Sequence, residues 1–382
     1  MKQLNIVWSP IVNEAVKILQ NLISINTSQG SEIVLAEYVA RLLSKEGISV
    51  IVSEPVKGRG SLVAQLTGGK SSPLVLLSHL DTAPASITEW SFSPYSGELK
   101  DGWIQGRGAI DCKGLLATHL AVIFIIKRLG LQLNRDLFLV SSAGEEEGGF
   151  IGTSWLLTKY PKLKTAEYVL GEGGGFGFET RERQYQLCQV GEKGKLIIFF
   201  RSRTLHSKIL YYAGKVAQKY NSFKEIQYPT VLTKILDMHR IQHNNVWVDC
   251  EKVTFELLPT INLERILWDF TKFMKREDSN FRLEVLEWTE GTISDKSSFL
   301  YEVIRRETKK MVGNNIVPYI TPGYSDNRFF RKLGIKVYGY QPLLPHCRPS
   351  WIHGISEKIS ISSLEFGIKL LFKIITEAFI EK

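Results

Sequence analysis

The first candidates for chemistry are polar residues at the end of an apolar run. The segment "PLVLLSH", residues 73–79, predicts a buried strand, and it ends in His79-Leu80-Asp81 where a loop begins. An imidazole and a carboxylate one residue apart on one face of a strand have two interpretations. They form either a surface pair that caps a turn, or the start of a metal site in which Asp81 holds the ring of His79.

Carboxylates recur in similar positions further along the chain. A glutamate triplet, residues 145–147, follows the predicted strand "RDLFLVSSAG", and Glu172 follows the apolar segment in "AEYVLGEGGG". Asp111 lies between glycines in "GRGAIDCKG", and His353 lies in "WIHGISEKI". Taken singly, each motif is also typical of solvated surface residues. Together they favour a site, because burying so many such groups without a cation would be costly.

Imidazole and carboxylate donors together suit zinc, with manganese or cobalt as alternatives. In a common hydrolytic arrangement, one carboxylate is shared by two ions about 3.5–4 Å apart, with a water between them. A glutamate beside the metals that is not itself a ligand can act as the general base on that water. The triplet 145–147 could supply both a ligand and a base.

The elements that must position these residues alternate between helix and strand in the first half of the chain. This alternation predicts an α/β sheet with helices on both faces, in which ligands gather at the carboxyl ends of strands. After about residue 177, longer strands such as "KLIIFFRSRT" predict an α+β insertion, and from about residue 292 the helix–strand–helix pattern returns. We therefore expect a catalytic domain in two segments, 1–176 and 292–382, interrupted by an insertion domain at 177–291.

Composition narrows the classes of partner. The 382 residues carry a net charge of +9, but the lysines and arginines form no single basic run, which argues against a nucleic-acid partner. Four separated cysteines without a CxxC pair argue against a disulfide framework. The N-terminal residues lack the apolar core of a signal peptide, and the apolar runs are too short to span a bilayer. We expect a cytoplasmic protein with neither a membrane nor a nucleic-acid partner.

The ordered set of motifs resembles one family in particular. The segments "LLSHLDTAPA", "GRGAIDCKG", "SSAGEEEGGFIG", "GEGGG", "TPGYSDNRFF" and "IHGISEKI" are similar to the co-catalytic zinc hydrolases. That family includes aminoacylase, glutamate carboxypeptidase, acetylornithine deacetylase and succinyl-diaminopimelate desuccinylase. The resemblance covers nearly the whole chain. It implies a zinc-peptidase-like catalytic domain with a mixed sheet flanked by helices, interrupted by a smaller α+β domain that serves as a lid or in dimerisation.

The resemblance also implies a role for each polar residue of the motifs. It implies two divalent ions, expected to be Zn²⁺, with Co²⁺ or Mn²⁺ as alternatives. Asp111 would bridge the ions, Asp81 would orient a histidine ligand, and Glu145 would be the general base. The five implied metal ligands are His79, Asp111, Glu146, Glu172 and His353.

On the substrate side, the resemblance implies three further residues. His206 would stabilise the oxyanion from the insertion domain, Asn245 would contact substrate, and Arg328 would lie near the substrate carboxylate. This chain departs from the family pattern here, with Leu205 before His206 and with Glu256 where relatives often carry arginine. The metal-binding motifs are therefore more typical of the family than the substrate-facing and dimer-facing ones.

The expected reaction is hydrolysis of an amide bond in a small substrate with a free carboxylate, by a metal-activated bridging water. N-acyl amino acids, dipeptides and the C-terminal residue of a short peptide are candidate substrates. One alternative is a biosynthetic deacylase of an acetylated or succinylated diamino acid. A second alternative is a non-catalytic binding protein on the same scaffold, since a fold alone does not determine function. A homodimer formed through the insertion domain is a further expectation from the resemblance.

Overall fold

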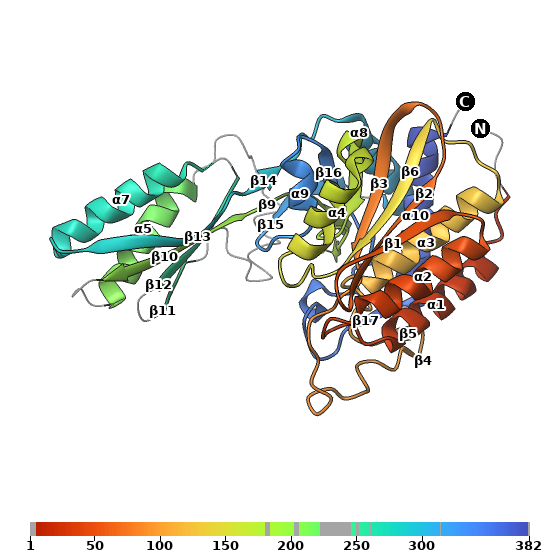
Figure 1. Cartoon of the computed structure of the whole chain (residues 1–382), viewed down its shortest axis with the longest axis horizontal. Coiled ribbons are helices and arrows are strands. Elements are labelled where there is room, and N and C mark those ends of the chain that lie inside the picture. Colours follow the sequence, from red (N-terminus) through yellow and green to blue (C-terminus); the bar gives the residue numbers. More distant parts are fainter. Residues whose placement is uncertain are drawn as a thin grey trace. The chain divides into compact units, whose positions relative to one another are not determined.

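The computed structural model describes residues 5–179, 184–201, 206–221, 246–249, 252–259, 261–313 and 315–380. The chain forms two compact units (Figure 1). The first comprises Met1–Gln189, Asp295–Val317 and Ser325–Lys382. The second comprises Val190–Ser294 and Pro318–Tyr324, so that it is inserted into the first along the chain.

The first unit is built on a mixed β-sheet. Strands β6, β3, β7 and β16 are neighbours and run parallel, whereas β1, β2 and β6 are joined antiparallel. Buried β-branched and leucine side chains fill the central strands, as expected when both faces of a sheet are covered. Seven strands of this sheet are, in order, β1 (Ser49–Val56), β2 (Arg59–Leu66), β6 (Arg135–Ser142), β3 (Ser71–His79), β7 (Tyr168–Gly171), β16 (Lys336–Gly339) and β9 (Gln184–Glu192). Strands β14 (Thr292–Ile293), β15 (Asn315–Thr321) and β8 (Gly177–Glu179) also pair with β9.

Helices cover both faces of this sheet, as the sequence predicted. Helix α3 (Lys113–Arg128) is apolar on nearly all sides and contacts β3, α1 (Trp8–Ser24) and α10 (Ile361–Phe379), so it is a central core helix (Figure 1). Helix α2 (Glu32–Lys45) packs on β1 and β2, and α8 (Phe299–Val312) packs on α10. Side chains of α4 (Trp155–Lys159) and α9 (Asn327–Arg331) join the cluster that covers the other face.

A separate three-stranded sheet lies in the first unit. Strand β5 (Trp103–Gln105) pairs with β4 (Glu98–Lys100) on one side and with β17 (Lys358–Ser360) on the other. The pairing is antiparallel, with Ile104 opposite Ile359. This small sheet therefore joins the segment before Asp111 to the segment after His353.

The second unit is an antiparallel sheet packed against two helices. Its strands, in sheet order, are β11 (Val246–Asp249), β12 (Lys252–Leu257), β10 (Gly194–Arg201) and β13 (Arg282–Thr289). Helices α5 (His206–Asn221) and α7 (Leu263–Glu277) contribute to one apolar core with β10 and β12. This is the α+β character predicted for the insertion. Strand β8 (Gly177–Glu179) and most of β9 belong to the first unit, because both pair within its sheet.

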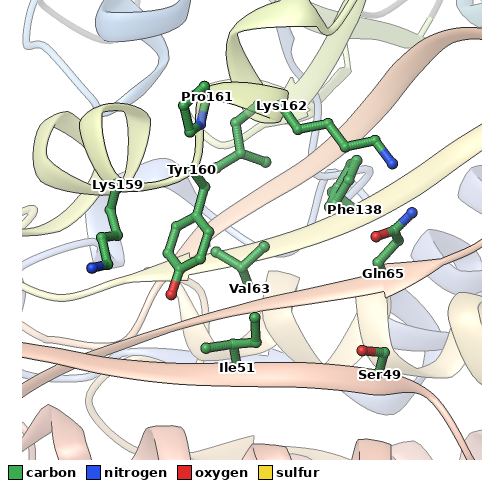
Figure 2. Close-up of a pocket in the computed structure, with 10 residues that line it drawn as sticks. Ser49, Ile51, Val63, Gln65, Phe138, Lys159, Tyr160, Pro161 and Lys162 are labelled. Atoms are coloured by element: carbon green, nitrogen blue, oxygen red, sulfur yellow. The ribbon is translucent and has the colours of Figure 1, made fainter.

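A hollow of about 230 Å³ lies on the first unit between β1, β2, β6 and the segment after α4. Ile51 and Val63 form its floor, and Lys159 and Tyr160 lie opposite them (Figure 2). None of the predicted site residues is among the residues that line it. Of the helices that the structure describes, none is both long and apolar enough to cross a bilayer.

Candidate metal centre

Three neighbouring parallel strands bring the predicted residues to one edge of the sheet. His79 is the last residue of β3, Glu172 directly follows β7, and Glu145 lies in the loop that follows β6. The order β6-β3-β7 makes these strands adjacent, so their carboxyl ends meet. Apolar runs that end in polar residues thus correctly indicated that these side chains lie at one edge of the sheet.

His79 lies at the centre of the cluster, with its side chain only 1% exposed. Its Nε2 is 2.9 Å from Oδ1 of Asp111 and 3.2 Å from Oε2 of Glu172. Its Nδ1 is 3.0 Å from the carbonyl oxygen of Asp81 and 3.4 Å from that residue's Oδ1. A histidine whose second nitrogen faces a carbonyl and a carboxylate is held in the tautomer that presents Nε2 to a metal.

The second imidazole approaches the same carboxylate from its other oxygen. Nε2 of His353 is 3.2 Å from Oδ2 of Asp111 and 3.0 Å from Oε2 of Glu146. The side chain of His353 is 54% exposed, and its φ of 58° lies in the left-handed region that non-glycine residues rarely adopt. Asp111 therefore lies between two imidazoles and contacts each with a different oxygen.

Asp81 also holds the glutamate loop. Its Oδ1 accepts a hydrogen bond of 3.1 Å from the backbone N–H of Glu145, and its Oδ2 accepts one of 2.9 Å from that of Glu146. A carboxylate oxygen of Glu146 in turn accepts a hydrogen bond of 3.0 Å from the N–H of Ala83. Asp81 thus contacts the ring of His79 and the backbone of both glutamates.

The electrostatics of the cluster favour a bound cation. Burial raises the pKa of Glu145 well above its usual range, and the charge of Glu172 adds to the shift. Burial outweighs the attraction of His79 and raises the pKa of Glu172 to about 7. Burial also opposes ionisation of Asp111, but hydrogen bonds with His353 and His79 prevail and lower its pKa. Asp111 is thus ionised readily, while the other two carboxyl groups would be stabilised in their charged forms by a nearby positive charge.

The donor chemistry fits a divalent metal. Ligand atoms of His79, Asp111 and Glu146 lie within 4.8 Å of one another, as do those of His79, Cys112 and Glu172. Over the residues that the structure describes, neither lysine nor arginine forms an ion pair with Asp111, Glu146 or Glu172. Carboxylate oxygens and imidazole nitrogens without a basic partner are the ligands that zinc and related ions prefer.

Of the three residues predicted to contact substrate, Arg328 is the one whose side-chain contacts the structure describes. Arg328 is 5% exposed; its Nη2 donates a hydrogen bond of 2.6 Å to the carbonyl of Gly148, and its guanidinium lies 4.8 Å from the ring of Phe329. His206 is the first residue of α5 in the second unit. Asn245 lies outside the described residues.

Two buried carboxylates were not predicted as part of the site. Asp326 accepts hydrogen bonds from Ser142 (2.6 Å) and Thr153 (2.7 Å), the residues that flank the glutamate loop. Glu357 accepts a hydrogen bond of 2.9 Å from the backbone N–H of Asp111. Both lie inside motifs that carried the family resemblance, and that position was the only signal in the sequence.

Comparisons with known proteins identify the family of this chain. Residues 75–377 match the model of peptidase family M20/M25/M40. The chain is 26% identical over 347 residues to an uncharacterized metallohydrolase of Methanocaldococcus jannaschii, covering 80% of this chain and 82% of the relative. It is 23% identical over 406 residues to the N-fatty-acyl-amino acid synthase/hydrolase of Xenopus tropicalis, covering 89% and 79%.

Solved structures show the same fold. A metallo-carboxypeptidase of the M20 family from Sulfolobus solfataricus superposes with a TM-score of 0.69 at 18% identity, over 95% of this chain and 98% of that one. A dinuclear metal-binding peptidase of the same family from Bacillus subtilis gives a TM-score of 0.62 at 10% identity, over 96% and 98%. The predicted resemblance and fold class are confirmed. The chain belongs to peptidase family M20/M25/M40 and is a metal-dependent peptidase or amidohydrolase.

Proposed function

We propose that this protein hydrolyses the amide bond of a small substrate that bears a free carboxylate, using two divalent ions that share Asp111. The observation that carries the proposal is the position of Asp111 between two imidazoles, with Oδ1 toward His79 and Oδ2 toward His353. Glu172 would complete the ligands on the His79 side, and Glu146 those on the His353 side. Each set supplies one imidazole and two carboxylates, counting Asp111 in both.

Divalent ions held by these residues would supply Lewis-acid chemistry, which polarises a carbonyl and makes a water molecule more acidic. We assign proton transfer to Glu145, which directly precedes the proposed ligand Glu146 in the chain but is not itself a ligand. The raised pKa of Glu145 suits a group that accepts a proton during attack on the carbonyl and then passes it to the leaving nitrogen. Asp81 holds both His79 and the backbone of Glu145, so it fixes the base relative to a ligand.

The substrate class rests on the relatives and on Arg328. One relative is named as an N-fatty-acyl-amino acid synthase/hydrolase, which favours N-acyl amino acids as the first substrates to test, with dipeptides second. Arg328, His206 and Asn245 remain our predictions for contacts with the substrate carboxylate and carbonyl. Zn²⁺ as the metal, a cytoplasmic location and a homodimer formed through the second unit are part of the same proposal.

The test compares two neighbouring glutamates. We expect Glu145→Gln to retain its metal but to lose a factor of at least ~100 in turnover of an N-acyl amino acid or dipeptide, as removal of a general base does. Glu147→Gln is the matched control, because Glu147 is 64% exposed and pairs with Arg59 rather than with the cluster. Full activity of the metal-loaded Glu145→Gln protein would contradict the proposal, as would a wild-type protein that binds no zinc, cobalt or manganese.

A further inference from the structure

Glu357 is a fully buried carboxylate whose hydrogen-bonding capacity is entirely used on the segment that carries Asp111. Its Oε1 accepts hydrogen bonds from the backbone N–H groups of Ile110 (2.8 Å) and Asp111 (2.9 Å). Its Oε2 accepts one from the N–H of Gly108 (3.0 Å) and one from Nη1 of Arg107 (2.9 Å). Four donors thus converge on one side chain with 0% exposure.

The position of Glu357 connects three segments of the site. It stands four residues after His353 and directly before β17, and its carbonyl oxygen accepts a hydrogen bond of 3.0 Å from the N–H of Gly106. Its partner Arg107 also donates to the carbonyl of Pro84, 3.3 Å away in the loop that follows His79 and Asp81. Glu357 therefore joins the segment of His353 to the backbone of Asp111, and Arg107 extends this connection to the loop that follows His79.

We infer that Glu357 is a positioning residue of the metal centre, which sets the separation between Asp111 and His353. This inference rests on the proposed function, because it assumes that those two residues bind metal. Buried ion pairs seldom increase stability relative to apolar residues of similar size, so stability alone does not account for the Arg107–Glu357 pair. Only an ionised carboxylate accepts four hydrogen bonds in this arrangement.

The chemistry of the side chain makes Glu357→Gln a sharp test. An amide has one oxygen, so in either orientation its NH₂ group would face two of the four donors. We expect the segment 107–111 to exchange its amide hydrogens faster than in the wild type, in metal-free protein. We also expect the affinity for Zn²⁺ or Co²⁺, measured by competition with a chelator, to fall by about 10–100-fold, the usual loss when a group that orients metal ligands is changed.

Glu307→Gln is the matched control. Glu307 also has 0% side-chain exposure and is in the first unit, but its ion pairs are with Arg306 and Lys310 of α8. This variant should keep the metal affinity and the exchange rates at 107–111 of the wild type. Glu357→Asp, which keeps the charge but shortens the side chain, provides a second variant in case Glu357→Gln does not fold.

Each outcome decides one question. Weaker metal binding by a folded Glu357→Gln or Glu357→Asp protein, with Glu307→Gln unchanged, supports the positioning role. Wild-type affinity in both Glu357 variants overturns it, and so does failure of both to fold without metal, since Glu357 would then be needed for the fold rather than for the centre. A wild-type protein that binds no metal would instead contradict the proposed function, whatever the exchange rates show.

Discussion

Nε2 of His353 lies 3.0 Å from Oε2 of Glu146, although the two residues are 207 positions apart in the chain. The same Nε2 of His353 lies 3.2 Å from Oδ2 of Asp111. His79, on the opposite side of that carboxylate, contacts neither His353 nor Glu146 within ion-pair distance in the described chain. The proposed centre thus divides into two halves that can be removed separately.

Removing the imidazole of His353 should abolish the binding of one of the two metal ions. We expect His353→Ala to bind close to one equivalent of Zn²⁺ where the wild type binds two, because His79, Asp111 and Glu172 stay in place. Metal analysis after gel filtration measures the ratio. His346→Ala serves as the control, since His346 is hydrogen-bonded to Ser360 and has no contact with the carboxylates of the cluster in the described structure. Two equivalents in His353→Ala would contradict the assignment of this ligand.

Metal removal should lower the thermal stability of the first unit. A ligand that binds only the folded protein stabilises it by about 2.7 kcal/mol when its free concentration is 100 times the dissociation constant. We therefore expect a chelator to lower the unfolding temperature of the wild type. Asp111→Asn should unfold at the same temperature with and without the chelator, because it has lost the shared ligand. Calorimetry on both proteins, with equal chelator concentrations, checks this.

Gly149 should tolerate no side chain. It has a φ of 69°, and a Cβ atom there would lie 1.9 Å from Oδ1 of Asp326, beneath the glutamate loop. Gly313 is a matched control, since its φ and ψ are the same (69° and 7°) but a Cβ there meets nothing within 4 Å.

We expect Gly313→Ala to cost about 1–2 kcal/mol for the left-handed backbone. Gly149→Ala should cost a further ~1–3 kcal/mol for the overlap with Asp326. Urea unfolding of both variants measures the difference. Equal losses would mean that the loop shifts freely away from Asp326.

Glu307 should make the stability of the folded protein depend on pH in the acidic range. Burial acts to raise its pKa, but hydrogen bonds from Lys310 and Arg306 prevail, so the folded-state pKa lies below the ordinary value of 4.5. A carboxylate with a lowered folded-state pKa stabilises the protein above its unfolded-state pKa, and this contribution disappears as the pH falls through the folded-state value. The wild type should therefore be more stable than Glu307→Gln near pH 7, and the gap should close below about pH 4. A gap independent of pH would show that charge is not its cause.

The position of the cluster could be predicted because a polar residue at the end of an apolar run marks the end of a strand. His79 and Glu172 each follow an apolar run, and parallel neighbours in a sheet bring such ends together. The order of the strands could not be read from the same runs. No local pattern shows that β16, from the last quarter of the chain, pairs with β7.

The two buried carboxylates Asp326 and Glu357 could not be predicted as part of the site, for a related reason. Glu357 meets the N–H of Asp111 across 246 positions, and its burial depends on packing that a single sequence does not reveal. Arg328 illustrates the same difficulty on the substrate side. The resemblance implied only that Arg328 lies near the substrate carboxylate, and it gave no indication that the guanidinium is buried against Gly148 and Phe329.

The place of β16 in the sheet has a consequence for biosynthesis. In the sheet, β16 lies between β7 and β9, but both of these strands are translated long before it. The larger part of the second unit, Val190–Ser294, is translated after β7 and before β16. A nascent chain that has not reached residue 336 therefore leaves the backbone edge of β7 without its partner and lacks His353 and Glu357. The whole of the second unit precedes residue 336, so the first unit can close its sheet and acquire His353 and Glu357 only after the second unit has been synthesised.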